Sequence, residues 1–255
     1  MRRVALCLMA HPDDAEFLAA GTLALLSERG WEIHLATATP GDAGTATATP
    51  TAIAATRRAE AAAAARHLGA AFHCLELRDL HVTYDADAID RALRLTRSIA
   101  PTLLITHSPA DYMPDHEVTA QLARTAALGY FVPNACGGPP AAHQAVPHLY
   151  YADPVGLIDH DGRPAACGLI VDISTTFARK LAMLQEHASQ RAWLQTHFGN
   201  DEYTESVRAW SQSRGRQVGV PWGEGFRQHR GYGHPSDCLL SRELGALAHH
   251  CGQET

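Results

Sequence analysis

Apolar runs alternate with amphipathic stretches along the first half of the chain. Residues 4–10 are uninterrupted apolar and are followed by Pro12, the pattern of a strand buried on both faces of a parallel sheet. Residues 14–29 carry apolar positions at helical spacing, acidic residues in the first turn and Gly30 just beyond the end. The two segments together predict a strand followed by a crossover helix.

This strand and helix unit repeats along the chain. The pattern predicts strands at 31–39, 72–77, 102–106, 148–152 and 169–173, and helices at 52–68, 86–99, 116–128, 175–187, 189–197 and 201–214. The composition of residues 132–147 and of residues 41–51 predicts two loops. We expect the second loop to be mobile and to lie beside a functional site. Such alternation indicates an α/β fold with an open, mostly parallel sheet, helices on both faces and a helical C-terminal extension. We expect one domain over residues 1–255, with residues 175–255 as the extension and C-terminal arm.

Composition narrows the class of protein. A chain of 255 residues, 46% of them hydrophobic, is long enough for one substantial core, and a formal net charge of −6 argues against nucleic acid as a partner. The six cysteines form no CxxC pair, which is typical of a reducing compartment. The first apolar run is too short for a signal peptide, and no later one could span a bilayer, so we expect a cytoplasmic protein without membrane contact.

Two short polar segments follow predicted strands and carry metal-ligand residue types. His11-Pro12-Asp13-Asp14 follows the first strand, and Asp111-Tyr112-Met113-Pro114-Asp115-His116 follows the fourth. Parallel strands bring such segments to one edge of a sheet. Two histidines and one carboxylate suit a catalytic zinc ion, and a second carboxylate can accept a proton from water.

Each segment alone has a simpler explanation. An Asp pair after proline is a common helix start, because carboxylates bind the free amides there. His116 alone could be an ordinary residue in the first turn of a helix. The combination of both segments at predicted strand ends favours the metal site.

The first segment carries a family signature. His11-Pro12-Asp13-Asp14-Ala15-Glu16, preceded by a strand and an alanine, resembles the AHPDDE motif of the PIG-L (LmbE-like) zinc-dependent N-deacetylases, and Pro114-Asp115-His116 resembles the end of their HPDH motif. Weaker likeness extends to residues 39–44, to Arg57 and Glu60, and to residues 224–227.

The resemblance implies a Rossmann-like fold and zinc-dependent hydrolysis of the N-acetyl group of an amino sugar or related small molecule. By this resemblance His11, Asp14 and His116 hold Zn²⁺, while Asp13 removes a proton from water and Asp115 is a second catalytic group. Arg57, Asp42, Asp79 and Tyr112 are assigned to the substrate, although Asp79 could equally form a surface pair with Arg78.

One departure from the family pattern concerns catalysis. Met113 stands where the family has a histidine thought to stabilise the oxyanion or the departing amine, and methionine cannot donate a strong hydrogen bond. Zinc alone could suffice, activity on ordinary acetamides could be weak, or another donor could replace the histidine. We favour replacement, with Tyr112, His229 and His234 as candidates.

Other functions stay open to different degrees. An amidase acting on another small-molecule conjugate and a catalytically weakened metal-binding oligomer are both compatible with the sequence. The absence of GxGxxG, Walker A and GxSxG motifs argues against a nucleotide-binding protein and a serine hydrolase. Residues 220–232 combine glycines and aromatic residues, a mixture typical of an arm that packs on another subunit; a tail folded over its own domain is the alternative. The resemblance to family members that form rings implies a homo-oligomer.

Overall fold

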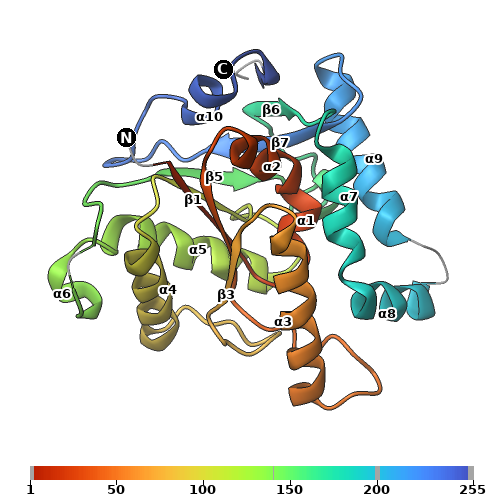
Figure 1. Cartoon of the computed structure of the whole chain (residues 1–255), viewed down its shortest axis with the longest axis horizontal. Helices are drawn as coiled ribbons and strands as arrows, with labels where there is room; N and C mark the ends of the chain where they lie inside the picture. The colour runs from red at the N-terminus through yellow and green to blue at the C-terminus, as the bar shows by residue number, and fades with distance from the viewer. Residues whose placement is uncertain (1–2, 140, 199–201, 252–255) are drawn as a thin grey trace.

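The structure is a computed structural model that describes residues 3–139, 141–198 and 202–251. An eight-stranded sheet forms its centre (Figure 1). The strands are β1 Val4–Met9, β2 Glu32–Thr37, β3 Ala71–Cys74, β4 Leu103–Thr106, β5 His148–Ala152, β6 Leu169–Asp172, β7 Gly223–Gln228 and β8 Ala248–His250. Their order is β3-β2-β1-β4-β5-β7-β6-β8. The first five strands pair in parallel, whereas β7 pairs antiparallel with β5 and β6, and β8 antiparallel with β6. The predicted open, mostly parallel α/β sheet is therefore confirmed.

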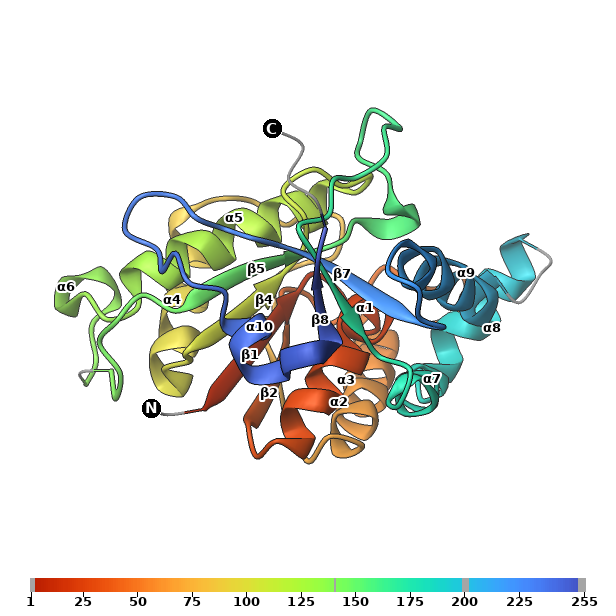
Figure 2. The same ribbon diagram turned by 90° about the horizontal axis from the view of Figure 1, so that it is seen from above.

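Helices cover both faces of this sheet (Figures 1 and 2). They are α1 Asp14–Leu18, α2 Ala20–Glu28, α3 Pro50–Arg66, α4 Ala86–Ile99, α5 Pro114–Gly129, α6 Pro133–Cys136, α7 Phe177–Gln185, α8 Ala188–Phe198, α9 Glu202–Gln217 and α10 Leu239–Leu244. Among the described residues, none of these helices combines the length and the apolar character that crossing a membrane requires.

The central strand β1 shows why the chain needs both layers. Ala5, Cys7 and Met9 enter one apolar core, shared with α1, α2, α3 and α7. Their neighbours Val4, Leu6 and Leu8 enter a second core, shared with α4 and α5. Successive side chains of a strand point to opposite faces, so an uninterrupted apolar run is stable only when both faces are covered.

The helix predicted at residues 14–29 is two helices, which corrects the sequence reading. Ala19 separates α1 from α2 with φ −141° and ψ −6°, outside helical values. The carboxylate of Glu224 accepts hydrogen bonds from the backbone amides of Gly21 (2.9 Å) and Thr22 (2.7 Å) at the start of α2. A residue two hundred positions away thus satisfies the amides exposed by the break.

Residues 220–232 do not form the arm that the sequence suggested. Within them, β7 is an inner strand of the sheet, between β5 and β6. A Cβ atom at Gly225 would lie 2.1 Å from Oδ2 of Asp153, and one at Gly223 would lie 2.8 Å from the Ile170 side chain. The two glycines allow this close approach, and their lack of side chains hid the strand from the hydrophobic pattern.

Candidate functional site

A cavity of about 460 Å³ opens between β1 and β4, where the order of the strands in the sheet reverses. Segments that follow the carboxyl ends of these two strands meet there, as expected for an open α/β sheet. The cavity is lined by His11, Asp13, Asp14, Phe17, Ala43, Gly44, Arg57, Asp79, Leu80, Tyr112, Met113, His116, Val155, Gln190, Tyr203, Ser206 and Trp210.

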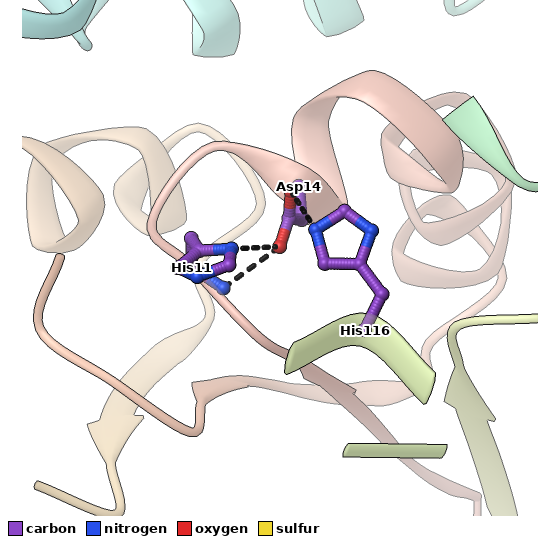
Figure 3. A group of neighbouring side chains, drawn as sticks. All are labelled: His11, Asp14 and His116. Carbon is purple, nitrogen blue, oxygen red and sulfur yellow. Dashed lines mark hydrogen bonds and ion pairs between the residues drawn. The ribbon is translucent and has the colours of Figure 1, made fainter. Parts of the chain in front are cut away.

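The three predicted metal ligands come together at this cavity (Figure 3). Nδ1 of His11 lies 3.4 Å from Oδ2 of Asp14, and Nε2 of His116 lies 3.6 Å from Oδ1 of the same carboxylate. One ligand atom from each residue lies within 4.8 Å of the other two, and all three side chains are buried. Two imidazoles and one carboxylate at this spacing fit the ligand set of a catalytic zinc ion.

Carboxylates fix the outward-facing nitrogen of each histidine. Nε2 of His11 lies 3.1 Å from Oδ1 of Asp79 and 3.3 Å from Oδ2 of Asp115. Nδ1 of His116 lies 3.1 Å from Oδ1 of Asp111. A metal-binding histidine characteristically donates its second N–H to such a partner, which sets its tautomer and orientation. The side chains around His11 and His116 therefore fit a bound metal as well as the ligands themselves do.

Asp13 lies in the cavity beside the ligands but is turned differently from Asp14. Its backbone has φ 101°, in the left-handed region that non-glycine residues rarely adopt. Oδ2 accepts a hydrogen bond from the Tyr203 hydroxyl (2.7 Å), and Oδ1 lies 3.4 Å from Nη2 of Arg57. Burial raises the pKa of Asp13 more than the neighbouring Arg57 lowers it. A carboxylate in this position can accept a proton.

Arg57 reaches the cavity from α3 beneath the loop that begins at Gly41. Its Nη2 donates to the carbonyl of Pro12 at 2.7 Å, which ties α3 to the turn after β1. A Cβ atom at Gly41 would lie 2.2 Å from Nη1 of Arg57, and one at Gly44 would lie 2.7 Å from it. Small residues in this loop thus make room for a buried guanidinium.

The other predicted site residues take different positions. Asp79 and Tyr112 line the cavity, whereas Asp42 and Asp115 do not. The Asp42 carboxylate accepts a hydrogen bond from the backbone amide of Asp79 (2.9 Å), so it supports the loop that carries Asp79. The Asp115 carboxylate accepts hydrogen bonds from the backbone amides of Leu80 (2.7 Å) and Val82 (3.3 Å), and it also faces His11. The surface pair between Asp79 and Arg78 does not form, because Asp79 is buried against His11.

Met113 lines the cavity, and two of the three candidates for replacing the family histidine do not. The backbone amide of His229 bonds to Leu149 at the opposite end of β5, and the His234 ring packs against His229 at 4.4 Å. Tyr112 does line the cavity, with 60% of its surface exposed.

The sequence reading missed the contribution of α9 and of His107. Tyr203, Ser206 and Trp210 all line the cavity from α9. Their spacing of three and four residues places them on one helical face, a signal that was available in the sequence. His107 stacks on His116 with ring centroids 3.9 Å apart, and its Nε2 lies 3.1 Å from Oδ2 of Asp14.

Comparison with known proteins finds similarity to one enzyme family and to two hydratases or deacetylases of known structure. The family model PIG-L, described as GlcNAc-PI de-N-acetylase, matches residues 6–127. A 4-oxalmesaconate hydratase of Pseudomonas putida KT2440 is 28% identical over 198 residues, which cover 74% of each chain.

Solved structures share the fold over almost the whole chain. GalB, the 4-carboxy-2-hydroxymuconate hydratase of Pseudomonas putida KT2440, superposes with a TM-score of 0.75 at 24% identity, covering 93% of this chain and 99% of that one. The N,N′-diacetylchitobiose deacetylase of Pyrococcus horikoshii superposes with a TM-score of 0.74 at 25% identity, covering 89% and 84%. The signature His-Pro-Asp-Asp, its position after β1 and these matches agree, and residues 6–127 carry the match to the PIG-L (LmbE-like) family of enzymes.

Proposed function

We propose that the protein is a zinc-dependent hydrolase that removes an N-acyl group, most simply N-acetyl, from an amino sugar or related small molecule. The observation that carries this proposal is the position of Asp13, which lies in the cavity beside His11, Asp14 and His116 without being one of the three clustered ligands. A zinc ion held by those three residues would supply a polarised carbonyl and a more acidic water.

The residues of the chain account for the proton movements. Asp13 accepts a proton from water as the water oxygen bonds to the amide carbon, and it returns that proton to nitrogen as the C–N bond breaks. The products are a carboxylate and a free amine. Arg57 and the rim residue Tyr112 would contact the remainder of the substrate, since both line the cavity.

A second candidate activity is the hydration of a carbon–carbon double bond in an unsaturated acid. It is supported by the 28% identity to a 4-oxalmesaconate hydratase and by Met113, since hydration releases no amine that needs a proton donor. The same Asp13 carboxylate would accept a proton from water as the water oxygen bonds to one alkene carbon, and would return that proton to the other carbon.

One assay separates the two activities. Purified protein is given a panel of N-acetylated amino sugars and, separately, 4-oxalmesaconate, with chelator or with added zinc. Acetate release that depends on zinc supports the hydrolase, and loss of the conjugated absorbance supports the hydratase. Asp13→Asn should keep its zinc and lose most of the turnover; full activity in a folded, zinc-loaded D13N would contradict the proposed role of Asp13.

A further inference from the structure

Helix α9 lies outside the residues matched by the family model and yet forms one wall of the cavity. Tyr203 is the member of this wall that reaches the catalytic carboxylate. Its hydroxyl donates to Oδ2 of Asp13 at 2.7 Å, and only 2% of its surface is exposed.

The Tyr203 side chain is held firmly in this position. Its ring packs edge-on against Phe17, with centroids 4.8 Å apart and an interplanar angle of 88°. Burial, and next the Asp13 carboxylate, raise the pKa of Tyr203 well above its ordinary value. The hydroxyl therefore keeps its proton and serves as a hydrogen-bond donor to Asp13.

Asp13 needs such support because its backbone is strained. A left-handed φ of 101° is unfavourable in a residue other than glycine and persists only where the surroundings enforce it. Arg57 approaches one carboxylate oxygen from α3, and Tyr203 holds the other from α9. Two helices that are distant in sequence thus fix the direction of this carboxylate.

We propose that Tyr203 is a positioning residue for Asp13, which it holds in the orientation that accepts the proton of water. The role rests on the proposed function of Asp13 in the same site. It makes α9 part of the catalytic machinery and assigns a task to a residue outside the family motifs. Removing the hydroxyl should slow the chemical step and leave substrate binding unchanged.

Kinetics of Tyr203→Phe give the first test, since phenylalanine keeps the ring contact with Phe17 and removes only the hydroxyl. We expect kcat to fall on the order of 10- to 100-fold, the scale of a displaced catalytic group, with KM and bound zinc unchanged. Tyr151→Phe is the matched control, because Tyr151 is also buried but its hydroxyl contacts His229 and it does not line the cavity. An unchanged kcat in Y203F, or a rise in KM that accounts for the whole effect, would overturn the proposal.

A thermal-unfolding cycle tests the contact without any substrate. Tyr203→Phe is compared in the wild-type protein and in Asp13→Ala. Loss of a hydrogen bond to a carboxylate should lower the melting temperature of the wild type by roughly 3–10 °C and that of D13A much less. Equal shifts in melting temperature in both backgrounds would contradict the hydrogen bond between Tyr203 and Asp13. If the wild type turns over no substrate, the proposed function fails, while unequal shifts in this cycle still support the hydrogen bond by which Tyr203 orients Asp13.

Discussion

The two histidines of the site differ in which ring nitrogen faces Asp14. His11 directs Nδ1 towards Asp14 and Nε2 towards Asp79 and Asp115, whereas His116 directs Nε2 towards Asp14 and Nδ1 towards Asp111. The candidate ligand set is visible in the sequence, whereas the carboxylates behind it, which leave one nitrogen of each histidine facing Asp14, are visible only in the structure.

Asp111→Asn should weaken zinc binding by about 10- to 100-fold, because the partner that orients His116 loses its charge. Competition with a chromophoric chelator measures this affinity. Asp90→Asn is the control, since Asp90 forms an exposed ion pair with Arg94 on α4. Equal zinc affinity in D111N and wild type would show that Asp111 does not support the metal site.

Met113→His should raise the kcat for release of acetate from an N-acetylated substrate, by roughly 10-fold or more, because it restores a proton donor in the cavity. Met113→Leu keeps an apolar side chain and should leave kcat near the wild-type value. If M113H is no faster than M113L, the missing histidine does not limit deacetylation.

Between elements, one buried ion pair joins three parts of the fold. Nζ of Lys180 on α7 lies 2.7 Å from Oε1 of Glu224 on β7, and the same carboxylate accepts amides at the start of α2. Both side chains are almost fully buried, at 1% and 2% exposed. This carboxylate therefore fixes the junction between α1 and α2, directly beside the turn that carries Asp13 and Asp14.

Lys180→Met should lower the free energy of unfolding by about 3–5 kcal/mol, because it leaves the Glu224 carboxylate buried without its cation. Urea unfolding measures the loss. Arg179→Gln, one residue earlier, removes a partly exposed pair with Glu28 and should cost less than about 1 kcal/mol. Similar losses in the two variants would mean that burial of the pair is irrelevant to stability.

At the scale of the whole molecule, the candidate metal site links two distant segments of the chain. His11 and Asp14 follow β1, while His116 lies in α5 after β4, so a bound ion would cross-link two segments that meet only in the folded sheet. Because such a ligand set does not exist in the unfolded chain, metal binding favours the folded state.

Zinc at about 100 times its dissociation constant should stabilise the protein by about 2.7 kcal/mol, or roughly 5–10 °C in melting temperature. Differential scanning fluorimetry with a chelator and then with added zinc measures the shift. His116→Ala should show no such rise, and a zinc-dependent shift retained in H116A would place the ion elsewhere.

The sequence by itself determined the order of strands and helices in the first half of the chain and the residues that gather at the candidate metal site. The reason is local: β1 is apolar on both faces, α4 begins and ends at the predicted residues Ala86 and Ile99, and the candidate ligands lie in the segments that follow β1 and β4. Periodicity and strand ends can be read without knowing what packs against them.

Tertiary structure decided the remainder, because it depends on partners far away in sequence. Glu224 stabilises the break between α1 and α2, and the glycines of β7 pack against Asp153 and Ile170, which made an inner strand look like a loop. Tyr203 becomes part of the site only when α9 packs against β7 and its side chain reaches Asp13 in the turn after β1, 190 residues away in sequence. Hydrophobic patterning records which face of an element is buried and carries no information on which distant side chain it will meet.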